Sequence, residues 1–296
     1  MEQFQYIYNN IEDNNEFVII EKYGNNAKHF TIVLIILFIV FVSIHISVEI
    51  WPSFFDVILS ALKSRSYHTQ ITIDYLVKQE QYCRIKQLYI NVAVYVEIFI
   101  VMATGAMLIA YIQYICGMFR IASYRIENIM QIHISQKKNL VYKSIVSAVD
   151  MHRKAMKFSD YFISRFEISF MLLIIFGVLT LSLNIFQMFQ VATSGYNTKE
   201  FLLQVIIVSV CILYMFLSNF IGQEIINHNN KVYSTAYNIC WYAAPLHIQK
   251  LILFLLQRGS KSFGLNVGGL FVASLECFAT LVKTSVSYFT VMYSVQ

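Results

Sequence analysis

The final stretch of the chain, residues 264–296, is apolar but carries side chains that could handle ions or water. Two charged residues, Glu276 and Lys283, lie within it. Hydroxyl groups accompany them at Thr280, Thr284, Ser285, Ser287, Thr290 and Ser294. The stretch is long enough to cross a bilayer, because about 20 helical residues span the hydrocarbon. Charge inside a membrane is costly and usually faces a protein interior or a water-filled path, so this pattern predicts a pore-lining helix.

Glu276 and Lys283 share one face of such a helix, because they are seven residues apart. Their separation of about 10 Å along the axis is too long for a direct ion pair. Each therefore needs water or a partner on another helix, and the spacing leaves structural pairing and pore electrostatics both open. A third intramembrane charge, Glu97, lies in the outer third of another apolar stretch. Its position fits a functional role and a structural ion pair equally well.

The motifs of enzymes and metal sites are absent from the sequence. It contains no HExxH, no GxSxG and no P-loop, and its five cysteines make no CxxC pair and no metal-ligand spacing with histidine. We therefore expect no enzymatic activity, no metal site and no cofactor. The net charge of +5 is too modest and too dispersed to indicate a nucleic-acid partner.

The composition indicates an all-α, polytopic membrane protein, since hydrophobic residues make up 57% of the chain and charged residues only 13%. We predict a cytosolic N-terminal segment over residues 1–28 and a transmembrane domain over 29–296. Five spans are expected at about 29–51, 88–118, 167–192, 201–222 and 264–296. A short amphipathic cytosolic helix is expected at 245–256.

Three sequence signals set the expected helix ends. The Gly24-Asn25-Asn26 sequence should end a helix in the N-terminal segment, and Pro52 should end the first span. The Gly259-Ser260-Lys261 sequence should separate the amphipathic helix from the final span.

The orientation follows from the basic residues, which are densest in residues 119–166. Positive charge marks the cytosolic side, and lipid headgroups are possible partners of this segment. With five spans, the N-terminus is then inside and the C-terminus outside. This arrangement is opposite to that of a rhodopsin-like receptor, whose C-terminus is cytosolic.

Several strings of specific residues resemble insect odorant receptors, particularly the large group in ants, bees and wasps. They are GLFVASLECFATLVKTSVSYFTVMYS (269–294), CWYAAPLHIQKLILFLLQR (240–258), YIQYICGMFRIASYRIE (Tyr111–Glu127) and FLSNFIGQEIINH (Phe216–His228). The resemblance extends from about Gly24 to Gln296. It implies a subunit of a ligand-gated, non-selective cation channel that binds odorants and assembles with a shared co-receptor as a heterotetramer. The implied location is the plasma membrane of olfactory sensory neurons.

The family fold has seven spans and an intracellular N-terminus, and the first span here resembles the third of the seven. The chain is therefore expected to be a truncated or partial member that lacks the first two helices. Because the second of those helices helps to wall the odorant pocket in the family, we expect the isolated 296-residue chain to be an incompetent odorant sensor.

The resemblance also implies pore residues. Gate positions fall on Val291 and Val295, one helical turn apart, and Ser294 lies between them. Tyr288 belongs to the preceding Ser287-Tyr288-Phe289 element, in which serine replaces the threonine of the family. The terminal Tyr-Ser-Val differs from the ending of gustatory receptors and favours the odorant branch.

The outer halves of the first, second and fourth spans could form the odorant pocket. Their mix of apolar, aromatic and polar groups suits volatile ligands, although ordinary helix packing explains each residue equally well. The candidates are Phe41, Ile44, His45, Val48, Tyr95, Phe99, Val205, Val208, Ser209 and Ile212.

Other functions remain open on the sequence. A non-sensing subunit, whether assembly-only or the product of a pseudogene, is compatible with every feature above. A gustatory receptor fits less well. A small membrane transporter should show an internal repeat with broken helices at matching positions, and the sequence shows none.

Overall fold

The computed structural model describes residue 11 and residues 13–62, 70–129, 138–193, 198–259, 261 and 263–295. These residues are almost entirely helical, which confirms the all-α expectation in its main part. The long helices are α2 (Asn14–Leu62), α3 (Gln70–Ile129), α4 (Lys138–Thr193) and α5 (Thr198–Asn238). They are followed by the short 3-10 helix η1 (Trp241–Ala243), α6 (Leu246–Gly259), strands β1 (Asn266–Val267) and β2 (Phe271–Val272), and α7 (Leu275–Ser294).

The chain divides into two compact units. The smaller unit is Gly24–Tyr111, and the larger unit combines Met1–Tyr23 with Ile112–Gln296. Within the smaller unit, Phe38 of α2 and Phe99 of α3 place their ring centroids 6.3 Å apart. Many of its described apolar side chains are exposed, as is typical of helices that face lipid or another protein.

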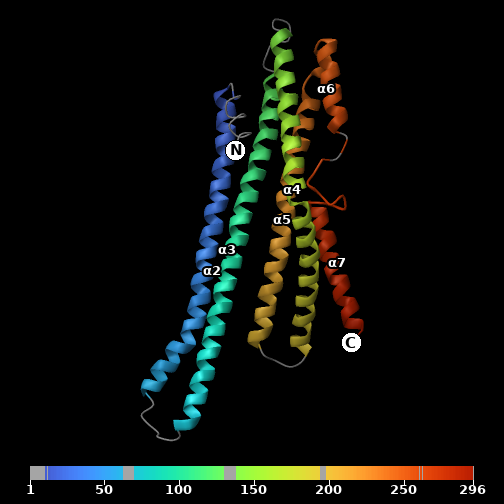
Figure 1. The fold of residues 1–296 in the computed structure, drawn as a ribbon. Helices are drawn as coiled ribbons and strands as arrows, with labels where there is room; N and C mark the ends of the chain where they lie inside the picture. Colours follow the sequence, from blue (N-terminus) through green and yellow to red (C-terminus); the bar gives the residue numbers. More distant parts are fainter. Residues whose placement is uncertain are drawn as a thin grey trace. The chain divides into compact units, whose positions relative to one another are not determined.

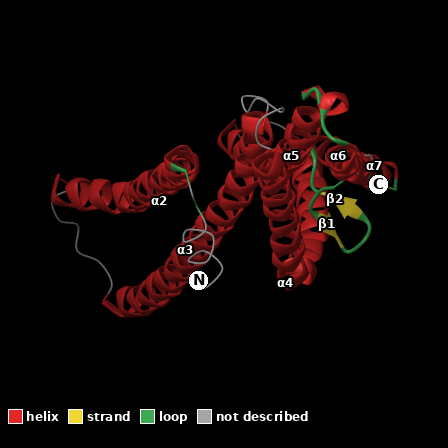
Figure 2. Cartoon of the chain, turned by 90° about the horizontal axis from the view of Figure 1, so that it is seen from above, coloured by secondary structure: helices red, strands yellow, loops and turns green. Residues whose placement is uncertain are grey.

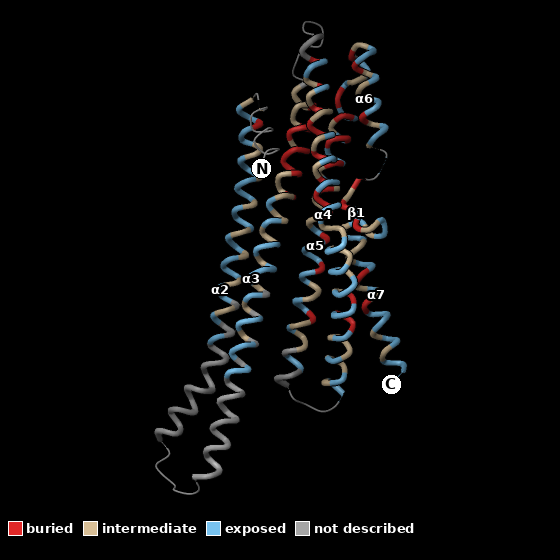
Figure 3. The backbone as a smooth tube through the Cα atoms, in the orientation of Figure 1, coloured by how far each residue is buried: buried red, intermediate tan, exposed pale blue. Residues whose placement is uncertain are grey.

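In the larger unit, α4, α5 and α7 lie side by side (Figure 1). Buried residues are concentrated where the end of α3 meets the beginning of α4, the end of α5 and α6 (Figure 3). A second core joins α4, α5 and α7 farther along, and Val178, Leu181, Val208, Met215 and Leu281 form it. The final helix is therefore anchored to α4 and α5 by apolar packing.

Four helical segments among the described residues are long and apolar enough to cross a membrane. They are Asn14–Val40, Asn91–Asn128, Val141–Thr193 and Gln204–Asn238. Their apolar side chains are largely exposed, Ile168 by 77% and Phe176 by 60% for example. Such surfaces suit lipid, and the chain is a multi-pass membrane protein. Helix α7 is more polar and is not among the four, so a fifth crossing stays a proposal.

Two expected helix ends are wrong. Helix α2 continues without a break through Gly24-Asn25-Asn26 and through Pro52 to Leu62. Propensity is a weak signal inside a long helix, because hydrogen bonds on both sides sustain the backbone. Apolar helices in membranes tolerate proline and glycine because neighbouring helices, Ser/Thr side chains and ordered waters satisfy the freed backbone groups. In contrast, α6 ends at Gly259 as its Gly-Ser-Lys sequence predicts.

The final helix begins later than residue 264. Residues 266–272 form an antiparallel hairpin with Asn266 opposite Val272 and Val267 opposite Phe271 (Figure 2). Its turn contains Gly268 and Gly269 with φ of 64° and 69°, a region that favours glycine. Those backbone angles exclude a right-handed helix at this point. Helix α7 starts after Ser274, whose Oγ accepts a hydrogen bond from the Cys277 amide at 3.1 Å.

Candidate functional site

One face of α7 packs closely on α4. Leu281 and Ser285 are buried on this face, and Ser285 meets the buried Ser182 of α4. The Ser182 hydroxyl lies 2.7 Å from the Val178 carbonyl and 3.0 Å from the Ser285 carbonyl, so it can donate to either oxygen. Small residues at both positions let the two helix backbones approach, as in many membrane helix pairs.

Aromatic rings extend this packing along α7. Phe189 of α4 meets Tyr293 edge-on at 4.9 Å between centroids and Phe289 at 5.9 Å. Nearer the beginning of α7, Phe278 meets Phe216 of α5 edge-on at 5.5 Å. Helix α7 is thus held at both ends, because edge-to-face ring pairs stabilise beyond their apolar area.

The beginning of α7 is pinned to α5 by polar groups. Asn219 accepts from the Ser274 amide at 3.4 Å, and Gln223 accepts from the Leu275 amide at 3.3 Å. These bonds satisfy backbone N–H groups that a helix start leaves without partners. Gly222 lies between them and faces Ala273, where a Cβ would lie 2.5 Å from the Ala273 carbonyl oxygen. The absence of a side chain therefore permits the contact.

The opposite face of α7 carries a line of polar side chains, here called the polar stripe. Its members recur at alternating intervals of four and three residues, which places them on one helix face. All of them are exposed: Glu276, Thr280, Lys283, Ser287, Thr290 and Ser294. Among the described residues, neither Glu276 nor Lys283 has a salt-bridge partner. The sequence predicted the shared face of the two charges, and packing against α4 and α5 leaves that face open.

Three of the predicted gate residues are exposed on one side of the polar stripe. Val291 is 59% exposed, Val295 83% and Tyr288 53%. At about 100° per residue, Val291 lies about 60°, Val295 about 100° and Tyr288 about 120° from the centre line of the stripe. Ser294 belongs to the stripe itself. Their role at a gate stays a prediction.

The structure places the predicted pocket residues in both units. On α5, Val208 and Ile212 pack in the core shared with α4 and α7, Val205 is half-buried and Ser209 is exposed. On α3, Tyr95 is half-buried and Phe99 is exposed. Side chains outside the described part of the structure are those of Phe41, Ile44, His45, Val48 and Glu97. Four of the members thus lie within about two turns of α5, and Tyr95 and Phe99 lie about one turn apart on α3.

A groove on the smaller unit lies close to some of these positions without including them. It is an apolar hollow of about 470 Å³ on α3. Its lining consists of Tyr89, Val92, Ala93, Val96, Ile100 and Val101. Most of these residues recur at the three- and four-residue spacing of one helix face. The sequence does not single out that face, because apolar residues occur on every face of this span.

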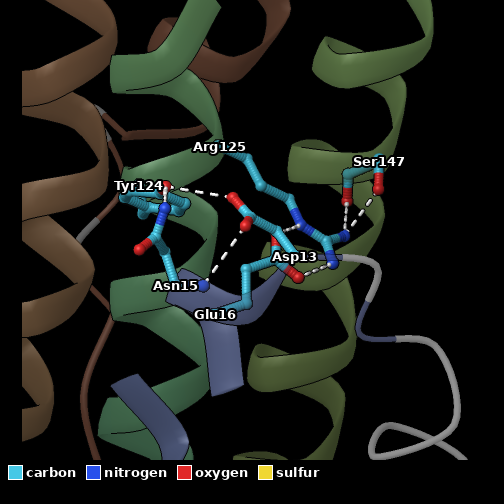
Figure 4. Close-up of polar contacts among 6 residues, drawn as sticks. All are labelled: Asp13, Asn15, Glu16, Tyr124, Arg125 and Ser147. Atoms are coloured by element: carbon cyan, nitrogen blue, oxygen red, sulfur yellow. Dashed lines mark hydrogen bonds and ion pairs between the residues drawn. The ribbon is translucent and has the colours of Figure 1, made fainter. Parts of the chain in front are cut away.

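Sequence reasoning missed an ionic cluster that fixes the beginning of α2 to α3 and α4 (Figure 4). Arg125 donates two hydrogen bonds to the Glu16 carboxylate, and its remaining terminal nitrogen donates to Ser147 Oγ at 2.5 Å. Beside it, Tyr124 donates to Asp13 at 3.1 Å and accepts from Asn15 at 2.8 Å. No local signal links residues so far apart in the sequence.

Tyr23 supplies a second attachment of the same segment. Its hydroxyl lies 2.8 Å from Nε2 of His228 on α5, and its ring lies over Gly117 of α3. A Cβ at Gly117 would lie 3.5 Å from the ring, an ordinary contact distance. Residues 13–23 are therefore attached directly to α3 and α5, and Arg125 links them to α4 through Ser147.

A buried histidine joins α4 to α5. Nε2 of His152 lies 3.0 Å from Oδ1 of Asn229 and 3.2 Å from the Tyr233 hydroxyl. An amide oxygen only accepts, so the contact with Asn229 requires a hydrogen on Nε2. Phe119 of α3 packs on the imidazole ring at 5.5 Å. This network is structural, since all four residues are buried.

Metal binding finds no support in the described residues, among which no three His, Cys, Asp or Glu side chains gather. The fold and the two-faced α7 instead define a multi-pass helical membrane protein with a polar final helix. A family model described as 7tm Odorant receptor matches residues 1–286. The chain therefore belongs to the odorant receptor family, a family of olfactory receptors and not of enzymes.

Solved structures share the fold. The insect olfactory receptor OR5 from Machilis hrabei in complex with eugenol matches with a TM-score of 0.65 and 16% identity, covering 95% of this chain and 69% of that one. A second structure of the insect olfactory receptor OR5 from Machilis hrabei matches with a TM-score of 0.56 and 17% identity, covering 71% of this chain and 53% of that one. No curated protein sequence matches the chain.

Proposed function

We propose that the chain is the odorant-binding subunit of a ligand-gated, non-selective cation channel. It acts with a shared co-receptor in a heterotetramer in the plasma membrane of olfactory sensory neurons. Membership of the odorant receptor family supports this role. The observation that carries it is the packing of α7, which is held by α4 and α5 on one face and leaves a polar face open on the other.

The proposed topology has five crossings, with the N-terminus inside and the C-terminus outside. Helix α7 is the fifth crossing, and its polar face requires a water-filled path because charge facing lipid is costly. The basic residues of 119–166 support an inner position for the end of α3 and the beginning of α4. Lipid headgroups are the expected partners of this inner end.

The gate consists of Val291 and Val295, with Tyr288 and Ser294 beside them. Apolar rings from several subunits close a pore by dewetting, and a modest widening allows water to return. Odorant favours the open state by the difference between its affinities for the open and closed forms. Widening therefore requires that odorant binding move α7.

The core between α5 and α7 offers a route for that movement. Val208 and Ile212 pack in the same core as Leu281 of α7. Packed interiors deform little and therefore transmit displacements. A ligand that pushes on Val205 or Ser209 of α5 thus also displaces this core. The other candidates from the sequence, Tyr95 and Phe99 on α3 and Phe41, Ile44, His45 and Val48 on α2, stay proposed odorant contacts.

The matches cover 69% of one Machilis receptor chain and 53% of the other. The test therefore begins by sequencing the full-length transcript that encodes this chain. The encoded protein is expressed with an insect co-receptor, and currents are recorded with a panel of volatile apolar compounds that includes eugenol. We expect Val291→Ser to raise the basal current by hydrating the gate. The control is Val286→Ser, an exposed valine on the side of the polar stripe opposite to Val291 and Val295.

The outcomes separate three readings. An odorant response together with a raised basal current in Val291→Ser supports the full proposal. A raised basal current without any odorant response supports an assembly-only subunit. Unchanged currents in Val291→Ser at normal surface expression overturn the role of α7 in the pore.

A further inference from the structure

The hydroxyl groups of the polar stripe are oriented by the helix that carries them. Thr280 donates to the Glu276 carbonyl at 3.0 Å and Ser287 to the Lys283 carbonyl at 3.0 Å. Thr290 donates to the Ser287 carbonyl at 2.7 Å and Ser294 to the Val291 carbonyl at 2.9 Å. Each hydroxyl hydrogen is thus directed to the backbone.

This orientation gives the stripe a chemical preference. A hydroxyl has one hydrogen and two acceptor lone pairs, so a hydroxyl that donates to its own helix presents its oxygen outward as an acceptor. Four such oxygens follow one another along the open face of α7. Oxygen acceptors solvate cations, whereas anions need donors. The uncharged part of the stripe therefore suits a hydrated cation.

The two charges act on this path in opposite senses. Glu276 lies in the first turn of α7 and attracts cations to one end of the stripe. Lys283 lies about two turns farther along the same face and repels them. Repulsion grows in proportion to the charge of the ion, so Lys283 opposes a divalent cation twice as strongly as a monovalent one.

We propose that the polar stripe is a cation path in which Glu276 sets the preference for cations over anions and Lys283 limits the passage of divalent cations. The inference rests on the proposed function, because α7 must line a pore for the stripe to meet ions. It adds two residues that determine selectivity, which are distinct from the apolar gate at Val291 and Val295.

The first experiment tests whether the stripe meets water. Single cysteines replace Ser287, Thr290 and, as a control, Val286 in the full encoded chain expressed with co-receptor. A positively charged methanethiosulfonate reagent is applied during channel activity, and the unsubstituted chain gives the background from native cysteines such as the exposed Cys240. We expect Ser287→Cys and Thr290→Cys to lose current several times faster than Val286→Cys, which is exposed but lies off the stripe.

The second experiment measures ion selectivity from reversal potentials. Glu276→Gln should lower the Na⁺/Cl⁻ permeability ratio by roughly twofold to fivefold, since one subunit loses one charge in a water-filled path. Lys283→Gln should raise the Ca²⁺/Na⁺ ratio by a similar factor. The controls are Glu167→Gln on α4 and Lys231→Gln on α5, which leave the stripe intact.

The outcomes distinguish this inference from the proposed function. Unreactive cysteines at both 287 and 290, in channels that reach the surface, overturn the pore role of α7 and the inference together. Reactive cysteines with unchanged permeability ratios in both charge variants overturn the inference alone. Reactive cysteines together with the two shifts in permeability support it.

Discussion

The buried Glu16 and the partly buried Arg125 form an ion pair that connects residues 109 positions apart in the sequence. Nε of Arg125 lies 2.6 Å from one carboxylate oxygen of Glu16, and Nη2 lies 2.7 Å from the other. The Arg125 side chain is 13% exposed and the Glu16 side chain 6%. Because the same guanidinium also contacts Ser147, one cation joins α2, α3 and α4.

Removing this cation should release the beginning of α2. Arg125→Ala leaves the buried Glu16 carboxylate without its partner, and breaking a buried pair in this way costs about 3–5 kcal/mol. We expect faster amide hydrogen exchange across residues 13–23, measured by mass spectrometry on the detergent-solubilised protein. Arg125→Lys should recover only part of the protection, since an ammonium group cannot make the two-pronged contact.

Arg153→Ala is the matched control, because Arg153 pairs with Asp150 on the same helix and its side chain is 66% exposed. A surface pair of this kind contributes at most about 1 kcal/mol. Equal protection of residues 13–23 in Arg125→Ala and Arg153→Ala would show that the ion pair does not hold the segment.

The histidine network yields a second prediction. Asn229→Leu keeps the approximate volume but removes the nearer acceptor of His152 Nε2 and leaves only the Tyr233 hydroxyl at 3.2 Å. The loss of one such buried hydrogen bond costs about 0.5–1.5 kcal/mol. We expect a lower midpoint of thermal unfolding in detergent. The neighbouring Asn230→Leu should change stability by less than about 0.5 kcal/mol, because Asn230 is exposed. A larger loss in Asn230→Leu than in Asn229→Leu would contradict the structural role of the network.

Gly222 and Gly24 should respond oppositely to the same substitution. Gly222→Ala places a Cβ 2.5 Å from both the Cβ and the carbonyl oxygen of Ala273, and such overpacking costs about 1–3 kcal/mol. Gly24→Ala meets nothing within 4 Å and should gain up to about 1 kcal/mol of helix propensity. Thermal unfolding of the two variants checks the signs. A stabilised Gly222→Ala would show that α5 and the start of α7 are less closely packed.

Phe189 should restrain the far end of α7. Phe189→Ala removes ring contacts with Phe289 and Tyr293, each contributing about 0.5–1.5 kcal/mol beyond apolar burial. In channels formed with the co-receptor, we expect a raised basal current because the gate end of α7 is released. Phe176→Ala on the same helix is the control, since its ring is 60% exposed. Identical basal currents in the two variants would remove Phe189 from the gating argument.

Local patterns in the sequence were sufficient for the class of protein and for several local features. The apolar runs predicted helices that cross a membrane, because a bilayer demands internally satisfied backbone hydrogen bonds. The spacing of Glu276 and Lys283 predicted their common helix face, which depends only on helical geometry. The same is true of the amphipathic α6, whose buried residues Ile248, Ile252 and Leu255 recur at helical intervals.

The tertiary structure decided what depends on distant parts of the chain. The sequence indicates that α7 has a polar face, but only contacts with Ser182, Phe189 and Phe216 show which face is packed. The pairing of Glu16 with Arg125 is likewise invisible in the sequence, since each charge looks like an ordinary polar residue of its own segment. Periodicity describes one helix at a time, whereas burial and partner choice arise from helices brought together by folding.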